Sequence, residues 1–570
     1  MKVTDAITKF LATHGVEFCF ELVGGMITHL LDSMAADGRV QIISSHHEQA
    51  AAFSAEGVGR QTLGRKLAVA MGTSGPGATN LITGIGSCWL DSVPCLFITG
   101  QVNTHELKDG LNIRQQGFQE LDIVSLVGTI TKSAVQITDR LRVLPELHRA
   151  LGLALSGRQG PVLVDLPNDI QRQDIPDEEV RRWMAMPLVV QAERVLTDAE
   201  IGQVMALCRS ASRPLVCVGG GARWASELIG WLAELATAGV PYVTTLMGHE
   251  QVNVDPYYFN MIGAYGNREA NWAIQNCDLL IVLGARMDVR QTGADIQDFA
   301  RHAKIIQIDI DAAQLNNQVK VDVALCVGAS NFCRQFRPRT GVFLSIDDQW
   351  VPRLLRMRDR SDIDEYADWK ISPHGIFRRL NEVFRGTAVE YVCDVGNHQM
   401  WAAHGLRVGE GQAVHYSGGM GAMGFALPAA IGVALSSRKM VVVITGDGSL
   451  QINIQELDTL RRLGLRIIII VMNNFALGMV KNFQDMYFDG RDQSTRKGYS
   501  CPSFVKVAAA YGIDAIPVSD MNELNVALAD AVHRSGPLLI EVLMEGANEC
   551  RPRLSFGKKL DEQYPAMNLG

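Results

Sequence analysis

The amino-acid sequence predicts an α/β protein with three doubly wound domains, each built on a parallel sheet. Short apolar strands alternate with helical patterns almost throughout, which is typical of parallel sheets covered by helices on both faces. Charged, irregular stretches interrupt the alternation at 171–193 and 333–368. The 570 residues also exceed what one core supports, since a domain usually holds about 150 residues. We therefore expect domains at 1–175, 190–340 and 370–550, followed by a tail at 551–570.

In the first domain, apolar runs of strand length alternate with segments in which apolar residues recur at helical spacing. A charged stretch that contains proline and methionine then follows, and we interpret it as a linker. The expected strands are Glu17–Leu22, Val40–Ser44, Lys66–Met71 and Pro94–Gly100, and the expected helices are Met26–Met34, Glu48–Arg60 and Ala78–Leu90.

The second and third domains repeat this alternation. One helix is expected over Gln451–Arg462, because Ile454, Leu457 and Leu460 lie on one helical face. The expected strands of the second domain are Leu215–Gly219, Tyr242–Thr245, Leu279–Gly284 and Ile305–Ile310, and those of the third are Ala388–Asp394, Met440–Thr445, Arg466–Val471 and Leu538–Leu543.

The composition excludes several classes of function. A net charge of −8 and a pI near 5.9 provide no basic surface for nucleic acid. The eleven cysteines are scattered without CxxC spacing, which favours reduced thiols over disulfides or a zinc site. No signal-peptide core follows the first residues, and the purest apolar run, Ile467–Met472, is far shorter than the roughly 20 residues that cross a bilayer. We expect a cytoplasmic protein with no nucleic-acid or membrane partner.

Two polar motifs end consecutive strands of the third domain. Gly446-Asp447-Gly448-Ser449 follows one strand and Asn473-Asn474 closes the next, so both lie at the carboxyl edge of one sheet. Mg²⁺ prefers oxygen ligands, which Asp447, Asn474 and a main-chain oxygen near Ala476 could supply. Each motif alone reads as a simple turn or strand end. Together they predict a magnesium site whose flanking glycines admit a diphosphate.

The two motifs, separated by 24 residues, resemble the cofactor motif of thiamine diphosphate enzymes. Segments 394–401, 418–425 and 446–457 look like the catalytic-subunit branch of the acetolactate synthases. Met423 matches the residue that props the cofactor into a bent conformation, although a methionine in an apolar segment is otherwise usually core filler. The cofactor contacts that the resemblance implies here are Asn397, His398, Gln399, Gly421, Met423, Gly446, Gly448, Ser449, Gly478, Met479 and Val480.

Glu48 is the candidate activating acid. Thiamine diphosphate supplies its own electron sink, but its aminopyrimidine needs a carboxylic acid beside one ring nitrogen, in an apolar setting. Glu48 opens a helix just beyond a strand and is followed by small apolar residues. By itself, this position reads as a glutamate that stabilises a helix N-terminus. The segment resembles the family's His-Glu-x-x-Ala stretch, however, in which Glu48 matches the activating glutamate.

Other first-domain residues are assigned by the same resemblance. Gln119 would lie near the reacting carbon, and Lys132 matches an active-site lysine of the acetolactate branch, with a solvated surface role as its alternative. Gly24, Gly25 and Thr73 would contact the cofactor. Since Glu48 and Asp447 fall in different domains, one cofactor must bridge two domains. In this family the bridge runs between subunits, which implies a homodimer or homotetramer.

The second domain resembles the FAD-binding domain of acetolactate synthases. Glycine-rich turns admit a pyrophosphate, and arginines can pair with it. Val289 and Met287 replace an acidic and an aromatic residue of that pattern, so FAD is a weaker expectation than thiamine diphosphate, and ADP is the alternative. The implied contacts are Gly220, Thr245, Leu246, Met247, Gly284, Arg286, Asp288, Arg290 and Asp309.

The chain departs from the acetolactate branch on the acceptor side. Leu22-Val23 replaces Tyr-Pro, the loop between Val102 and Phe118 is about six residues longer than usual, and Phe483 replaces a tryptophan. A longer polar loop and a smaller aromatic suit a different, larger acceptor, and the loop resembles that of enzymes which transfer a two-carbon unit to the ketone of a nucleotide-linked deoxysugar, as in yersiniose-type branched sugars. A second 2-oxo acid stays open as the acceptor. Drift in a surface loop is the alternative explanation.

The predicted function is a magnesium-dependent carboligase that decarboxylates pyruvate and transfers the two-carbon unit to a carbonyl acceptor. The alternatives are two-carbon transfer to a ketosugar, a simple 2-oxo acid decarboxylase or lyase, and a catalytically silent homologue. Silent homologues usually lose the activating acid or the metal ligands, whereas Glu48, Asp447 and Asn474 are all present.

Overall fold

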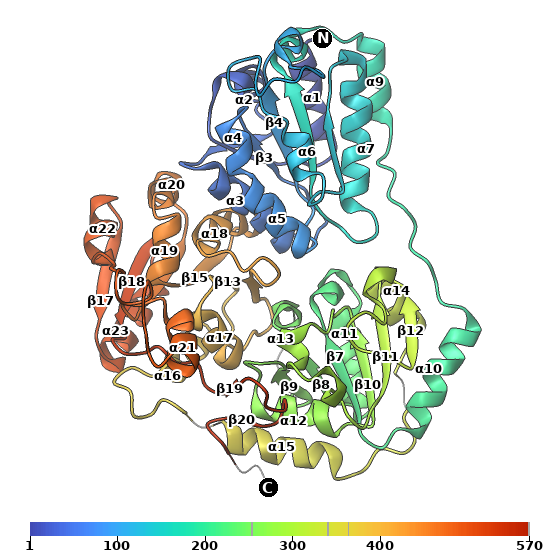
Figure 1. Ribbon diagram of the computed structural model, residues 1–570, viewed down its shortest axis with the longest axis vertical. Helices are drawn as coiled ribbons and strands as arrows, with labels where there is room; N and C mark the ends of the chain where they lie inside the picture. Colours follow the sequence, from blue (N-terminus) through green and yellow to red (C-terminus); the bar gives the residue numbers. More distant parts are fainter. Residues whose placement is uncertain (252–254, 339–340, 363, 568–570) are drawn as a thin grey trace.

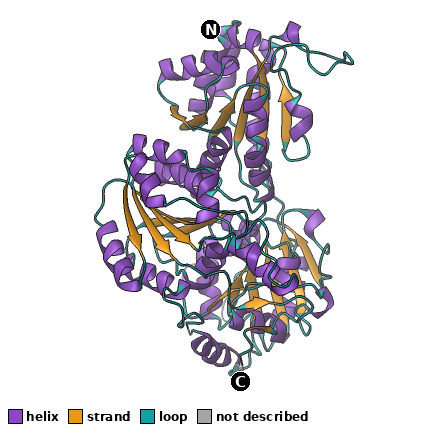
Figure 2. Cartoon of the chain, turned by 60° about the vertical axis from the view of Figure 1, so that its left-hand side comes forward, coloured by secondary structure: helices purple, strands orange, loops and turns teal. Residues whose placement is uncertain are grey.

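The computed structural model describes residues 1–251, 255–338, 341–362 and 364–567. Three six-stranded parallel sheets follow one another along the chain, each flanked by helices on both faces (Figures 1 and 2). The predicted fold class is therefore confirmed. No helix in the described part of the chain is long and apolar enough to span a membrane.

The first sheet has the strand order β2-β1-β3-β4-β6-β5 and contains the four predicted strands, with β5 and β6 in addition. The charged stretch at 171–193 is not simply a linker, because it contains α9, which buries Val180. The elements are β1 (Phe18–Glu21), β2 (Gln41–Ser44), β3 (Val69–Gly72), β4 (Leu96–Gln101), β5 (Ser133–Gln136), β6 (Val162–Pro167), α1 (Val3–Thr13), α2 (Thr28–Asp37), α3 (Glu48–Gln61), α4 (Pro76–Asn80), α5 (Ile82–Leu90), α6 (Ile123–Val127), α7 (Val143–Leu155), α8 (Asn168–Arg172) and α9 (Asp177–Ala185).

The second sheet has the order β12-β11-β10-β7-β8-β9. The Arg-rich stretch at 333–368 was predicted to be irregular, but it contains α15, which buries Trp350 and Leu354. The elements are β7 (Pro214–Val218), β8 (Tyr242–Thr244), β9 (Tyr258–Met261), β10 (Leu279–Leu283), β11 (Lys304–Asp309), β12 (Val323–Cys326), α10 (Asp198–Ser210), α11 (Leu228–Thr237), α12 (Arg268–Asn276), α13 (Val289–Thr292), α14 (Ala329–Gln335) and α15 (Trp350–Ser361).

The third sheet has the order β14-β13-β15-β16-β18-β17. The single helix predicted over 451–462 is wrong: a turn at 453–455 separates two helices, and the Asn453 side chain there donates to the carbonyl of Gly424. The elements are β13 (Val389–Cys393), β14 (Ala413–Tyr416), β15 (Met440–Gly446), β16 (Ile467–Asn473), β17 (Asp514–Val518), β18 (Leu538–Leu543), α16 (Pro373–Val383), α17 (Asn397–Gly405), α18 (Ala426–Ser437), α19 (Asp447–Ile452), α20 (Glu456–Leu463), α21 (Gly478–Tyr487), α22 (Phe504–Ala510) and α23 (Met521–Ala531).

The C-terminal tail runs back over the second domain. It forms the short pair β19 (Arg553–Leu554) and β20 (Gln563–Tyr564). The Leu554 amide donates to the Ala264 carbonyl at 2.7 Å, and the Gln563 side chain donates to Gly266 at 2.7 Å. The tail therefore ties the end of the chain to the central sheet.

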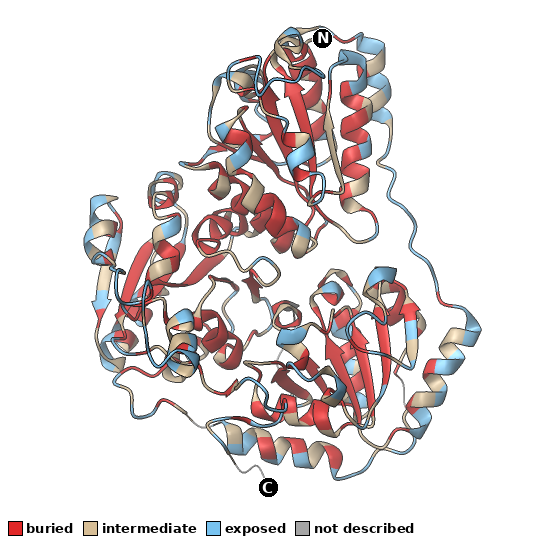
Figure 3. Cartoon of the chain, viewed as in Figure 1, coloured by how far each residue is buried: buried red, intermediate tan, exposed pale blue. Residues whose placement is uncertain are grey.

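Helices α3 and α18 cross where the first and third domains meet, and both are buried on nearly all sides (Figure 3). Their close approach depends on glycine. A Cβ on Gly57 would lie 2.2 Å from the Ala429 carbonyl oxygen, and one on Gly432 would lie 1.9 Å from that of Ser54. Larger residues would force the backbones apart, because packed interiors leave no room for an added methyl group.

Candidate functional site

The third sheet brings the predicted metal ligands to one edge. Gly446, the last residue of β15, pairs with Met472 of β16, so Asp447 and Asn474 leave adjacent strands together. Burial raises the pKa of Asp447 to about 6, and Tyr499 donates to its carboxylate at 2.8 Å. The Asn474 amide nitrogen donates to the Ala547 carbonyl at 2.7 Å, so its oxygen is the atom suited to a cation. Ala476 is buried beside them.

No cluster of three His, Cys, Asp or Glu side chains that could hold a metal occurs in the described part of the chain. A cation at this edge would therefore depend on one carboxylate, amide and main-chain oxygens, and oxygens from its ligand. That donor set suits Mg²⁺, which commonly shares one or two carboxylates with substrate phosphates.

A polar cradle lies beside these residues at the start of α17. Both polar atoms of the Asn397 amide and Nε2 of His398 are buried without a partner among the described residues. A Cβ on Gly478 would lie 2.8 Å from Asn397 Nδ2, and one on Gly446 would lie 2.9 Å from His398 Nδ1. Burial lowers the pKa of His398 to about 3, so its ring is neutral. Since buried polar groups almost always find partners, this cradle fits a polar ligand.

Met423 lies over the glycine turn at 446–449. A Cβ on Gly448 would meet Met423 Cε at 3.4 Å, and Ser449 donates to the Val395 carbonyl at 2.9 Å. Asp394 holds the loop before α18 by accepting from the amides of Gly424 and Ala426. The turn, the cradle and Met423 therefore form one group, which we call the third-domain group.

The remaining third-domain residues differ in their setting. Gln399 is buried, but its amide already donates to the Ser417 carbonyl at 3.1 Å. Gly421 takes a positive φ of 63° in the loop that leads to Met423. Met479 and Val480 are in the first turn of α21, beside Gly478, and Val480 is exposed.

A second group lies at the carboxyl edge of the first sheet. Glu48 is buried, and its carboxylate accepts from Asn80 Nδ2 at 2.9 Å. A Cβ on Gly77 would lie 3.2 Å from Glu48 Oε1 and 2.9 Å from Thr73 Cγ2, while one on Gly24 would lie 2.5 Å from Thr73. Asn80 was not predicted as the partner of Glu48, because only the fold reveals that contact.

Gln119 joins this first-domain group. A Cβ on Gly75 would lie 3.1 Å from Gln119 Cβ, and both residues have a positive φ. The Met26 amide donates to Thr73 Oγ1 at 3.3 Å, next to Gly25. The first-domain group therefore contains Gly24, Gly25, Glu48, Thr73 and Gln119.

The structure places Lys132 elsewhere. It directly precedes β5, which runs parallel to β6, so it lies at the amino edge of the first sheet, opposite the first-domain group. Its ammonium donates to the Ser156 carbonyl. Burial lowers the pKa of Lys132 to about 8. Its catalytic role remains a prediction, which its described contacts do not support.

The polar contacts of the two groups stay within their own domains. Glu48 bonds to Asn80 and Asp447 bonds to Tyr499. The neighbour of Glu48, Gln49, does reach the third domain, where Asn453 donates to its side chain at 3.1 Å. The chain alone thus presents two separate groups.

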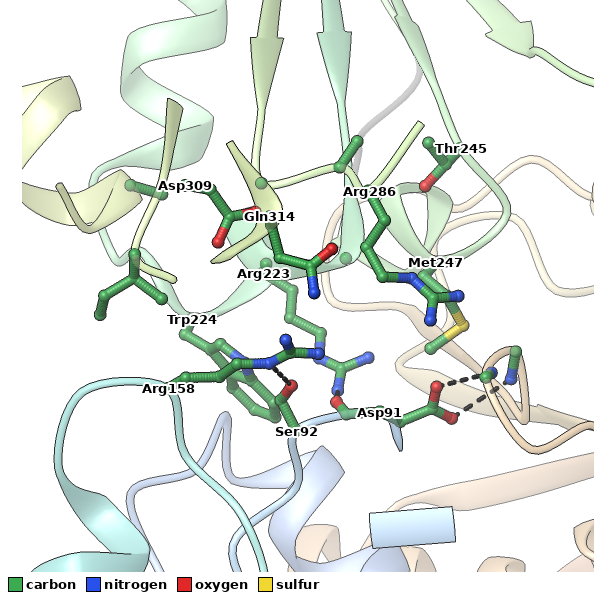
Figure 4. A pocket seen from close by; sticks show the side chains of 18 of the residues that line it. Asp91, Ser92, Arg158, Arg223, Trp224, Thr245, Met247, Arg286, Asp309 and Gln314 are labelled. Atoms are coloured by element: carbon green, nitrogen blue, oxygen red, sulfur yellow. Dashed lines mark hydrogen bonds between the residues drawn. The ribbon is translucent and has the colours of Figure 1, made fainter. Parts of the chain in front are cut away.

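The third candidate region is a cavity of about 390 Å³ at the edge of the central sheet (Figure 4). Arg286 pairs with Asp288 at 3.0 Å, and burial raises the pKa of Asp309. Gly284 has a φ of 64° and packs directly on Gly221. All nine residues predicted for this domain line the cavity: Gly220, Thr245, Leu246, Met247, Gly284, Arg286, Asp288, Arg290 and Asp309.

Several lining residues were missed by sequence reasoning. The first domain contributes Asp91, Ser92 and Arg158, and Arg223 and Trp224 continue the glycine turn after β7 (Figure 4). Arg158 pairs with Asp311 at 3.0 Å. Arg223 directly follows the glycine turn, which could have revealed it. The first-domain residues are distant in sequence, so no local signal could have revealed them.

Comparisons with known proteins cover the whole fold. Family models described as thiamine pyrophosphate enzyme N-terminal TPP binding domain, central domain and C-terminal TPP binding domain match residues 1–126, 201–336 and 394–542. The acetolactate synthase isozyme 2 large subunit of Escherichia coli is 34% identical over 567 residues, which cover 99% of each chain. The chain belongs to the thiamine pyrophosphate enzyme family.

Other relatives of this thiamine pyrophosphate enzyme carry similar names. The probable acetolactate synthase large subunit of Methanocaldococcus jannaschii is 34% identical over 98% of this chain and 94% of its own. The chloroplastic acetolactate synthase 3 of Brassica napus is 34% identical over 98% of this chain and 85% of its own. The N-terminal model covers the sheet that carries the first-domain group, and the C-terminal model covers the sheet that carries the third-domain group. The central model covers the domain at whose sheet edge the cavity lies.

Proposed function

We propose that this chain is a thiamine diphosphate- and Mg²⁺-dependent carboligase of the acetolactate synthase type. It would decarboxylate pyruvate and join the two-carbon unit to a second 2-oxo acid. The observation that carries the proposal is the cradle of Asn397 and His398 beside Asp447 and Asn474, in which both polar atoms of the Asn397 amide and Nε2 of His398 are buried without a partner in the described part of the chain. The match to acetolactate synthases along nearly the full chain supports the reaction type.

The third-domain group would hold the diphosphate and the metal. Asp447, the Asn474 amide oxygen and the Ala476 carbonyl would bind Mg²⁺. The amides after Gly446 and Gly448, with Ser449, would face the phosphate oxygens, because a glycine turn at a helix start offers unshielded N–H groups. Gly478 leaves room beside Asn397, and Met423 would support the ring system over the turn.

Glu48 would act at the other end of the cofactor. Thiamine diphosphate supplies the carbanion-stabilising ring when bound. The Glu48 carboxyl would hold a proton at a pyrimidine nitrogen, and its burial excludes water from that contact. Asn80 fixes the carboxylate orientation, and Gln119 extends over the same edge. The walls at Gly24 and Thr73 would limit where the pyrimidine sits.

We infer that two copies of the chain complete each site, as a homodimer or homotetramer. The two groups lie on different domains, and among the described residues of one chain no polar contact joins them. Large apolar side chains next to both groups are exposed, including Phe118 at 78%, Val480 at 54% and Phe483 at 53%. A second copy would cover them and bring the first-domain group to the third-domain group.

The central cavity would hold a nucleotide, FAD or ADP. Its glycine turn and its arginines suit a pyrophosphate. Flavin redox chemistry has no part in the proposed reaction, so the nucleotide would serve as a structural ligand.

The test is incubation of the chain with ¹³C-labelled pyruvate, thiamine diphosphate and Mg²⁺, with products identified by NMR. Pyruvate alone and pyruvate with 2-oxobutanoate should give labelled 2-aceto-2-hydroxy acids, and omission of either cofactor should stop the reaction. A nucleotide-linked ketosugar serves as the competing acceptor. Release of acetaldehyde alone, or exclusive transfer to the ketosugar, would overturn the acceptor assignment, and no carbon dioxide release would overturn the whole proposal.

A further inference from the structure

Five charged side chains are buried together where the three domains meet. Arg60, near the end of α3, contacts Glu56 at 2.6 Å, Asp91 at 2.5 Å and Glu250 at 3.1 Å. Arg223 donates to Glu250 at 2.9 Å and to the Asp91 carbonyl. Each side chain is at most 3% exposed. We call these residues the ion cluster.

The ion cluster reaches the central cavity through Arg223. This residue lines the cavity and extends toward Asp91 (Figure 4). Its Nε is buried and donates to no acceptor in the described part of the chain. A buried donor without a partner, on a cavity wall, indicates an acceptor on the ligand. A guanidinium suits the oxygens of a phosphate in particular.

The ion cluster also holds the segment that carries Met423. Asp91 accepts from the amides of Gly418 at 3.2 Å and Gly419 at 2.7 Å. Glu250, which Arg223 contacts, accepts from the Tyr416 amide at 2.9 Å. These bonds fix the first residues of segment 416–424, which leads to Met423.

On its other side, the ion cluster contacts the helix of the activating acid. Arg60 and Glu56 belong to α3, which begins at Glu48. One contiguous set of charged contacts therefore links the cavity wall, segment 416–424 and α3. A buried charge must keep its partners, because an unpaired one carries a large desolvation cost. Movement of Arg223 must accordingly be followed by Asp91 and Glu250.

We propose that Arg223 contacts the nucleotide in the central cavity and positions segment 416–424 through Asp91 and Glu250. The proposal rests on the proposed function, since it concerns that function's nucleotide and its thiamine diphosphate. With Arg223 held by the nucleotide, segment 416–424, which leads to Met423, is ordered before thiamine diphosphate binds. Each ligand then tightens the other by the same factor, as linkage requires.

The experiment titrates the full chain with thiamine diphosphate at saturating Mg²⁺ by calorimetry, without nucleotide and then with saturating FAD or ADP. One nucleotide should tighten thiamine diphosphate binding by at least about fivefold in the wild type. The coupling ratio is the dissociation constant of thiamine diphosphate without nucleotide divided by that with nucleotide. Titration of the nucleotide with and without thiamine diphosphate should give the same ratio. Arg223→Met should weaken nucleotide binding and bring the ratio to about one, because the side chain keeps its length but loses every donor.

Arg286→Met is the matched control. Arg286 lines the same cavity but pairs with Asp288, outside the ion cluster. It should weaken nucleotide binding while the ratio stays at the wild-type value. Since Arg223→Met leaves Glu250 with fewer partners, Arg223→Met/Glu250→Gln removes both charges and tests the same loss of coupling if the single variant does not fold.

The outcomes separate this inference from the proposed function. Tight binding of thiamine diphosphate with no effect of either nucleotide, or with neither nucleotide bound, overturns the inference alone. A wild-type ratio preserved in both Arg223 variants overturns it too. Failure of the wild type to bind thiamine diphosphate at all overturns the proposed function and this inference together.

Discussion

The central cavity and the thiamine diphosphate site are assembled in different ways. The cavity takes its walls from all three domains of one chain, and its charged residues are largely paired, as in Arg286–Asp288 and Arg158–Asp311. The proposed coenzyme site lies in two groups, and both polar atoms of the Asn397 amide and Nε2 of His398 are buried without a partner among the described residues. The difference teaches that one chain would suffice for the proposed nucleotide, whereas the proposed reaction would need a second copy.

Glu48→Gln should have the largest effect. The amide cannot exchange a proton with the pyrimidine, so kcat for carbon dioxide release from pyruvate should fall by about 10²–10⁴-fold, with the fold retained. Glu178→Gln changes an exposed glutamate of α9 and should leave kcat unchanged. Wild-type turnover in Glu48→Gln would show that the first-domain group is not part of the coenzyme site.

Asp447→Asn should act on binding. With its carboxylate lost, the metal-dependent affinity for thiamine diphosphate should weaken by about 100-fold, since metal sites depend on anionic ligands. Calorimetry with and without Mg²⁺ measures the change. Asp514→Asn, which changes an exposed partner of Arg534, is the matched control. Equal affinity of Asp447→Asn and the wild type would mean that the metal binds elsewhere.

Coexpression of Glu48→Gln with Asp447→Asn tests the two-copy arrangement directly. If each site combines groups from two copies, a mixed dimer has one intact site, and random pairing should restore about a quarter of the wild-type activity. Tagged subunits allow the mixed dimer to be purified and assayed. No recovery in a purified mixed dimer would show that each chain completes its own site.

The smallest effect should come from pH. Burial raises the pKa of Asp447 to about 6, so the free carboxyl still holds a proton at pH values where an ordinary aspartate is ionised. The proton competes with Mg²⁺, and the metal affinity should fall by about tenfold for each pH unit below 6. Titrations of Mg²⁺ from pH 5 to 7 measure this slope, which Asp447→Asn should lack. A flat profile in the wild type would contradict the ligand assignment.

Much of the fold and of the site could be predicted from local signals. The alternation of apolar strands and helices located the three sheets, and the turn at Asp447 and the strand end at Asn474 follow directly from strands. The central residues were predicted from the resemblance of three short segments to the FAD-binding domain of acetolactate synthases, with the glycine turn as the physical reason for a pyrophosphate there. These signals need only a few neighbouring residues.

The features that could not be predicted depend on distant packing. The break at Asn453 arises because its side chain bonds to Gly424, and α9 and α15 form because Val180 and Trp350 find buried surfaces. Asp91 joins the cavity only because the first domain folds against the second. No spacing in the sequence reports such contacts.

The crossing of α3 and α18 has a mechanical consequence. Gly57 and Gly432 let the two backbones pack directly on each other. Glu48 begins one helix, and Met423 lies three residues before the other. Because the helices pack directly on each other at this crossing, a tilt of either helix would also move the other. Such a tilt would shift Glu48 and Met423 together. In the proposed two-copy arrangement the acid and the methionine of one chain would serve different sites, so a change at this crossing would be felt in both sites at once.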